Sequence, residues 1–123
     1  MNNYINEIGS VERETLVLGT YPTITDAISI IGAASFSRGD VVVRGADGSI
    51  ALADASAASA AGVPSMGVIC DGIVVKAGET AAAAMYIKGE FNRRALNFAK
   101  GTTADDLRNV MAAIGLIVRE TRV

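Results

Sequence analysis

The feature that most restricts the fold of this chain is an Asp-Gly turn between two short apolar runs. Residues 40–43 form the first run, residues 49–53 form the second, and the glycine-containing stretch 45–48 separates them. Asp-Gly between apolar runs favours a β-hairpin, because glycine tolerates the positive φ that a tight turn requires. The sequence therefore predicts two adjacent antiparallel strands here. The turn type stays open, because the connection can exceed two residues.

Further short apolar runs continue this pattern along the chain. Residues 66–70 and 72–76 form two of them, and residues 82–91 form a third. Residues 25–32 fit either a strand or a short turn of helix, and their β-branched side chains favour the strand. Residues 54–65 are mostly Ala, Ser and Gly, which is typical of a surface loop. Short strands at this spacing predict a small antiparallel sandwich or barrel-like domain.

One short helix is predicted near the C-terminus. Thr103 is a suitable N-cap, and Asp105 and Asp106 follow in the first turn, where carboxylates favour the helix dipole. The apolar stripe of this helix has the spacing i, i+3, i+4 and i+7 and consists of Leu107, Val110, Met111 and Ile114. Gly115 ends the helix, and residues 116–118 form a last strand. The predicted class is α+β and β-rich, with one short C-terminal helix.

The composition removes several classes of chemistry. The chain has 123 residues, which fits one domain, and it contains no histidine and one cysteine, Cys70. A histidine-based triad, a histidine metal site and an internal disulfide are therefore excluded. The net charge is −2, and the basic pair Arg93 and Arg94 is isolated, so we expect no nucleic-acid partner. The mean hydropathy of +0.37 suggests further burial between subunits.

The motifs that resemble functional sites have simpler structural interpretations. An Arg-Gly-Asp tripeptide occupies 38–40, and we expect its glycine to turn the chain into the following strand. Cys70 lies in an apolar run without a basic neighbour, which predicts a buried, unreactive thiol. Asp71, Glu79 and Glu90 are scattered along the chain, and their spacing does not define an acid–base pair. We therefore predict no catalytic residue, no metal site, no cofactor and no small-molecule substrate.

We expect neither a leader nor a membrane segment. The first residues lack the basic and apolar regions of a signal peptide, and the apolar stretches 28–34 and 81–87 are far shorter than the ~18 residues that span a bilayer. We therefore expect no membrane partner and synthesis in the cytoplasm.

Several stretches, in order, resemble one family. The most specific is 86–98 (YIKGEFNRRALNF), in which GEFN is followed by AL. The Asp-Gly turn at 47–48, the strand 66–69 (MGVI), the helix start 104–107 (ADDL) and the stretch 114–118 (IGLIV) accompany it in the expected order. Together they make the chain resemble the lambda-type head decoration proteins of tailed bacteriophages.

This resemblance implies a structural function. Such proteins are homotrimers that bind at local three-fold positions on the outer surface of the expanded capsid, where they clamp the major capsid protein and catalyse nothing. The resemblance covers about residues 39–120 and implies a flexible, capsid-contacting N-terminal arm. We place this arm at 1–20, before one β-rich domain at 21–123. The sequence of the first segment fits a frayed tail or a partner-binding arm equally well. Its apolar residues could add a strand to a sheet of the capsid, and they are Tyr4, Ile5, Ile8, Val11, Leu16, Val17 and Leu18.

Two other functions remain as alternatives. A small β-rich oligomer also fits a fibre, baseplate or tail accessory protein of a virion, because a fold does not fix a function. A small hydrolase or lyase that uses Asp and Glu alone is a third possibility, and it requires two carboxylates in one cleft.

Overall fold

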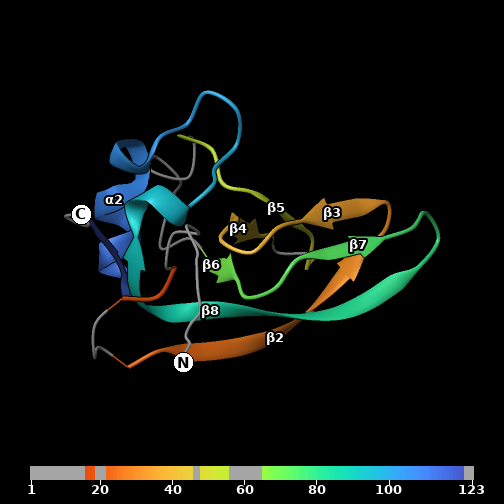
Figure 1. Ribbon diagram of the computed structural model, residues 1–123. Helices are drawn as coiled ribbons and strands as arrows, with labels where there is room; N and C mark the ends of the chain where they lie inside the picture. Colours follow the sequence, from red (N-terminus) through yellow and green to blue (C-terminus); the bar gives the residue numbers. More distant parts are fainter. Residues whose placement is uncertain (1–15, 19–21, 46–47, 56–64, 121–123) are drawn as a thin grey trace, which may run out of the picture.

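The computed structural model describes residues 16–18, 22–45, 48–55 and 65–120. The elements within these ranges are β2 (Ile24–Ile31), β3 (Ala34–Phe36), β4 (Val41–Arg44), β5 (Ile50–Leu52), β6 (Met66–Ile69), β7 (Ile73–Val75), β8 (Thr80–Asn92), the 3₁₀ turn η3 (Arg93–Ala95), α2 (Ala104–Ala113) and β9 (Leu116–Arg119). Figure 1 shows α2 at one end of the molecule and the paired strands extending toward the other end. The β-rich class with one short helix is confirmed.

The long strand β8 organises the larger sheet. It pairs with β2 along its first two-thirds and with β6 near Met85 and Tyr86, and the order of the sheet is β2-β8-β6-β4-β5. In β2, Ile28 and Ile30 are buried, whereas the residues beside them are exposed. This alternation is the period of a strand with one covered face. It settles the choice between strand and helix at 25–32 in favour of the strand.

The predicted hairpin is formed by β4 and β5. Val42 lies opposite Leu52, and the backbone N–H of Gly45 donates to the carbonyl of Ser49 over 2.7 Å. Gly48 has φ +88°, a conformation that side-chain-bearing residues rarely adopt. The connection therefore runs from Gly45 to Ser49, which is longer than a two-residue turn.

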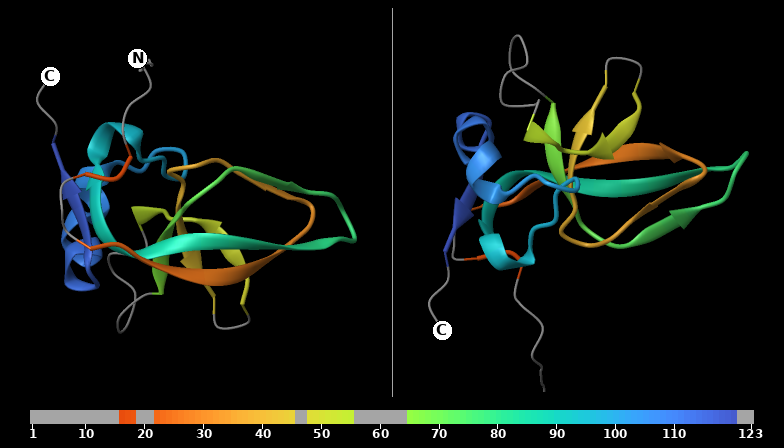
Figure 2. Two further views of the ribbon diagram at one scale, coloured as in Figure 1. Left: turned by 60° about the horizontal axis from the view of Figure 1, so that its bottom comes forward. Right: turned by 90° about the horizontal axis from the view of Figure 1, so that it is seen from above.

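A second, two-stranded sheet covers the inner face of the β2–β8 ribbon. It consists of β3 and β7, with Phe36 opposite Ile73. Figure 2 shows that β7 lies apart from β8 along most of its length and joins it through the turn at the distal end. The cluster between the two layers consists of Ile28, Ile30, Phe36, Val42, Ile69, Val75 and Met85. Because this core lies between two strand layers, the predicted sandwich-like or barrel-like arrangement describes this half of the molecule.

The helix closes the other half of the molecule. The backbone N–H of Thr103 donates to the Asp106 carboxylate over 2.8 Å, and Gly115 follows the helix at φ +95°, so both predicted ends are confirmed. Leu107 and Met111 are fully buried. The core cluster beneath the helix consists of Leu16, Val41, Ala53, Met66, Val68, Phe91, Leu96, Ala104, Leu107, Met111, Leu116 and Val118.

The last strand departs from the purely antiparallel expectation. β9 runs parallel to the C-terminal part of β8, with Gly89 opposite Leu116 and Asn92 opposite Arg119. Parallel neighbours require a crossover connection, and η3 with α2 provides one here. The apolar stripe of α2 therefore covers the strand pair that the helix itself connects.

Candidate functional site

The N-terminal segment reaches the body of the domain earlier than predicted. Val17 forms a bridge with Phe91, the Leu18 N–H donates to the Glu90 carbonyl over 2.9 Å, and the Asn92 N–H donates to the Leu16 carbonyl over 2.8 Å. Leu16 is 4% exposed and belongs to the core beneath the helix. These contacts add a short strand to the edge of β8 opposite β9.

The predicted arm at 1–20 is therefore corrected at its C-terminal end. Leu16, Val17 and Leu18 are part of the domain, because the outer edge of β8 offers backbone partners and the core offers a site for the Leu16 side chain. The other predicted arm residues, which are Tyr4, Ile5, Ile8 and Val11, lie outside the described residues.

The Arg-Gly-Asp tripeptide is a structural corner. The Asp40 carboxylate is buried and accepts from the Ser37 backbone N–H at 2.8 Å and from Asn97 Nδ2 at 3.1 Å. Arg38 Nη1 donates to the Cys70 carbonyl at 2.6 Å. Gly39 turns the chain into β4 at φ +94°. Because both charged side chains are engaged within the domain, the structural interpretation of this motif is confirmed.

Cys70 is buried, as predicted. Burial raises the pKa of its thiol, the neighbouring Asp71 charge adds to that effect, and Arg38 opposes it. A thiol with a raised pKa is a poor nucleophile at neutral pH. The side chain therefore has the properties of a small apolar residue in the core.

The scattered carboxylates do not converge. Glu79 precedes β8 and Glu90 lies near its end, and eleven residues of extended chain separate them by ~35 Å. Glu90 pairs with Arg119 at 3.4 Å. Within the described ranges, no group of three potential metal-ligating side chains is present. Glu79 and Glu90 are therefore too far apart to share a cleft.

A surface ion network connects the start of the crossover after β8 with α2 and with the residue that follows β9. Arg93 contacts Glu120 at 2.5 Å and Asp105 at 3.2 Å, and Arg108 lies 4.0 Å from each of these carboxylates. Arg93 lowers the pKa of the Glu120 carboxyl, chiefly by hydrogen bonding to it. Asp105 thus belongs to this network as well as to the first helical turn. No local pattern in the sequence points to Glu120, because its partners are distant along the chain.

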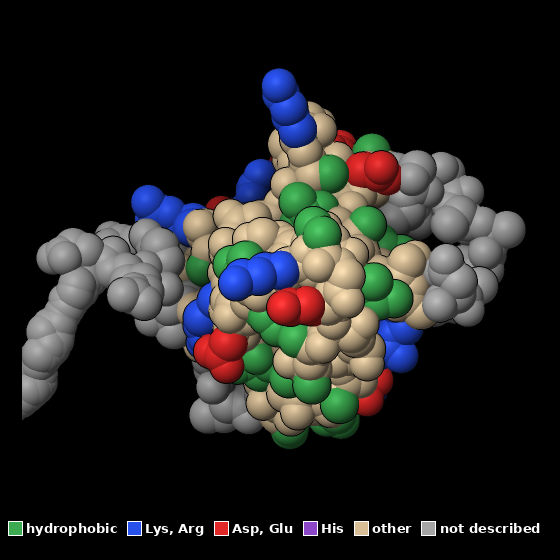
Figure 3. Space-filling view, turned by 90° about the vertical axis from the view of Figure 1, so that its right-hand side faces the viewer, with side chains coloured by type: hydrophobic (Ala, Val, Ile, Leu, Met, Phe, Trp, Pro, Cys, Tyr) green, Lys and Arg blue, Asp and Glu red, His purple; other side chains and the backbone are tan. Residues whose placement is uncertain are grey.

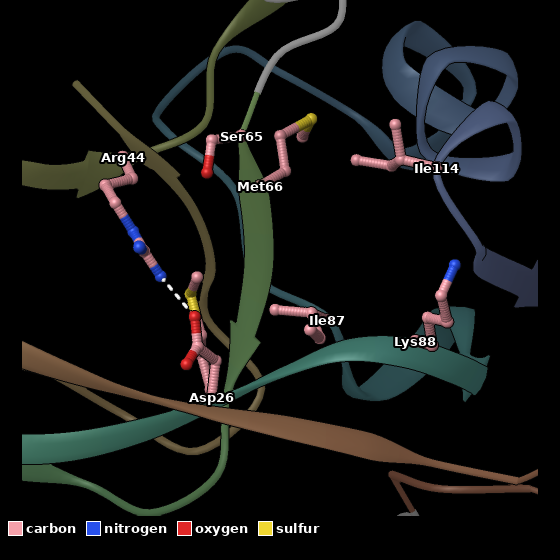
Figure 4. Close-up of a pocket in the computed structure, with 8 residues that line it drawn as sticks. Asp26, Arg44, Ser65, Met66, Ile87, Lys88 and Ile114 are labelled. Atoms are coloured by element: carbon pink, nitrogen blue, oxygen red, sulfur yellow. Dashed lines mark hydrogen bonds and ion pairs between the residues drawn. The ribbon is translucent and has the colours of Figure 1, made fainter. Parts of the chain in front are cut away.

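A small cavity opens between β2, β4, β6, β8 and the end of α2, and Figure 4 shows the side chains around it. Its volume is about 280 Å³. Arg44 and Asp26 form an ion pair of 2.9 Å on one side, and Lys88 stands on the other side, next to Ile114. The remaining lining residues are Ser65, Met66, Met85 and Ile87. Sequence reasoning missed this site, because its members come from five separate segments.

The outer face of the β2–β8 ribbon is exposed and uncharged in its distal part. Ala27 and Ser29 of β2 lie opposite Ala84 and Ala82 of β8, and all four are exposed. Figure 3 shows the distal end of the molecule, where apolar side chains lie around basic and acidic ones. The exposed large apolar residues of the described chain are Ile24, Ile31, Leu52 and Val74, and Ile31 and Val74 are the most exposed of them. A surface of this kind can be buried by a partner at low desolvation cost.

The comparisons with known proteins add no relative. No protein-family model matches the chain, and no curated protein matches it in sequence. Among the described residues, no helix is long and apolar enough to cross a membrane.

Proposed function

We propose that this chain is a capsid decoration protein of a tailed bacteriophage. It binds as a homotrimer at local three-fold positions on the outer surface of the expanded capsid, and it clamps neighbouring copies of the major capsid protein. The resemblance in 86–98 motivates this proposal. The observation that carries it is the short N-terminal strand at Leu16–Leu18. This strand attaches the fifteen residues before it to the domain at their C-terminal end.

An anchored starting point favours binding by an arm. The Leu16 side chain and two backbone hydrogen bonds hold the base of the arm against β8. The preceding residues include Tyr4, Ile5, Ile8 and Val11, which are suited to strand addition at a sheet edge of a partner. Ordering such a segment costs conformational entropy, so a single arm binds weakly.

A trimer compensates for weak single arms. After one arm binds, the other two are held at high effective concentration, and the avidity can exceed the single-arm affinity by ~10²–10⁴. The uncharged outer face of the β2–β8 ribbon and the exposed Ile31 and Val74 offer apolar surface for contacts between subunits. The polar groups that the sequence singled out, including Asp40 and Arg93, hold the fold together, which suits a structural protein.

The test uses three forms of the protein. The first is the parent, and the second lacks residues 1–12 but keeps the anchored strand. The third replaces residues 1–12 with a Gly/Ser segment of equal length, so that it keeps the length of the arm without its side chains. Light scattering gives the mass of each form, and sedimentation with expanded, undecorated capsids measures binding.

We expect all three forms to have the mass of a trimer and the parent alone to bind the capsids. Full binding by the Gly/Ser form would contradict the arm mechanism. A parent protein that stays monomeric and ignores expanded capsids would overturn the proposed function itself.

A further inference from the structure

The cavity of Figure 4 has a cationic rim above an apolar floor. Met66 and Met85 are buried beneath it, and Ile87 and Ile114 are half-buried at its sides. Arg44 and Lys88 each contribute a positive charge, and Asp26 contributes one negative charge. The site is therefore net positive in a chain whose total charge is −2.

The two positive charges differ in how they are compensated. Asp26 Oδ2 accepts from Arg44 Nη2 at 2.9 Å, so that the charge of Arg44 is largely offset within the pair. Lys88 has no carboxylate partner within the described part of the chain. Its ammonium group lies over Gly115, where a β-carbon would come within 3.0 Å of Nζ. Gly115 follows the C-terminus of α2, whose negative dipole end favours a cation at this place.

A second donor at this site also lacks an acceptor. Among the residues that the structure describes, Arg44 Nε is fully buried and has no hydrogen-bond partner. A buried donor without a partner loses its hydrogen bonds to water without replacement, and native proteins satisfy most such groups. An acceptor that enters the cavity, either a water molecule or an oxygen of a ligand, would provide the missing partner.

We propose that this cavity binds a carboxylate carried on a short aliphatic group. The carboxylate balances the charge of Lys88, and the aliphatic part covers Met66, Met85 and Ile87. A cationic ligand would be repelled by the rim, and a neutral one would make no charge-assisted contact with Lys88. The volume of about 280 Å³ is enough for one side chain or a short acid.

Two kinds of ligand carry a carboxylate on a short aliphatic group, and they are a free short-chain acid and the C-terminal residue of a polypeptide. Hexanoate represents the first, and N-acetyl-leucine represents the second. Hexanol and N-acetyl-leucine amide are their neutral counterparts. The inference does not depend on the proposed function, because it concerns a site away from the N-terminal strand.

The methionine methyl groups provide a direct readout. We would label them with ¹³C and follow their NMR signals during titration of the full-length protein with each compound. We expect the Met66 and Met85 signals to shift with a Kd on the order of 1 mM for the better acid, and the neutral counterpart to bind at least tenfold more weakly. Met111 is fully buried on the inner face of α2 and serves as the internal control. The acid with the lower Kd identifies the source.

The matched variants are Lys88→Gln and Lys76→Gln. Lys88→Gln should weaken acid binding about tenfold, because it removes a charge-assisted contact. Lys76→Gln should change nothing, because Lys76 is exposed in the turn before β8. An unchanged Met111 signal would show that each variant is folded. The proposal is wrong if neither acid shifts Met66 and Met85, if the neutral compounds bind equally well, or if Lys88→Gln binds like the parent.

Discussion

Replacing Leu16 by alanine tests directly whether the N-terminal segment is anchored in the domain. A leucine in a free arm makes no lasting contacts, and its replacement changes the free energy of unfolding by less than about 0.5 kcal/mol. In the structure the side chain is 4% exposed, and one of its methyl groups lies close to Gly39 in the corner before β4. The two interpretations therefore predict different stabilities.

The expected loss follows from burial. Truncation of a buried leucine to alanine costs about 2–5 kcal/mol, and a site at the edge of a sheet relaxes more easily than a central one. We therefore expect a loss of about 2–4 kcal/mol for Leu16→Ala. With an unfolding entropy of about 2.1 cal/mol/K per residue, a chain of this length loses about 4 °C of Tm per kcal/mol. The expected decrease in Tm is about 8–16 °C.

Circular dichroism during heating measures this decrease, and all variants are compared at one protein concentration because self-association would raise every Tm. Two leucines calibrate the result. Leu107→Ala removes a fully buried side chain and should lower Tm at least as much, whereas Leu52 is 39% exposed and its replacement should have little effect. A Tm within about 2 °C of the parent for Leu16→Ala, together with the expected loss for Leu107→Ala, would refute the anchoring.

Three further substitutions test other parts of the structure. Gly67→Ala should lower Tm by several degrees, because a β-carbon there would come within 2.9 Å of a backbone carbonyl of β8, whereas Gly72→Ala, with 3.5 Å to its nearest neighbour, should be tolerated. Asp106→Ala removes the carboxylate that caps α2 and should cost about 1 kcal/mol, which a urea titration can measure. Glu120 has a lowered pKa in the folded state, so its contribution to stability is present above its unfolded pKa of about 4.5 and is lost as the pH falls through the folded value. Glu120→Gln should therefore flatten the dependence of Tm on pH in the acidic range, and an unchanged acidic slope would contradict this assignment.

The elements that depend on residues close together in the chain could be predicted from the sequence. The hairpin around Gly48 and the helix between Thr103 and Gly115 each depend on residues close together in the chain, and both are confirmed. The strand β3 was missed, because its three residues have no strand period of their own and extend only by pairing with β7. The parallel pairing of β9 was also missed, because an apolar run predicts a strand but not whether that strand pairs parallel or antiparallel to its neighbour.

The candidate sites were harder to predict for a related reason. The sequence around Leu16 does not indicate whether this apolar run packs on its own domain or on a partner. It packs on its own domain because the edge of β8 offers it backbone hydrogen-bond partners. The cavity depends on Arg44 and Lys88, which are separated along the chain and look like ordinary surface charges. Their proximity is a consequence of the sheet order, and the order of strands is a property of the complete fold.

The two ends of β8 differ in how its neighbours are held, and this difference bears on how the domain could act as a clamp. Near Asn92, β8 has a strand on each side, formed by Leu16–Leu18 and by β9. Near Thr80 it supports β2, the edge strand of the sheet. The Gly32 N–H donates to the Glu79 carbonyl, so by the alternation of an antiparallel ladder the N–H and C=O groups of Ala27 and Ser29 point away from β8. The end that anchors the N-terminal segment is thus fixed on both sides, whereas the distal end carries an open backbone edge beside an uncharged face. Force transmitted through the N-terminal segment would therefore enter the molecule where its strands are paired most completely.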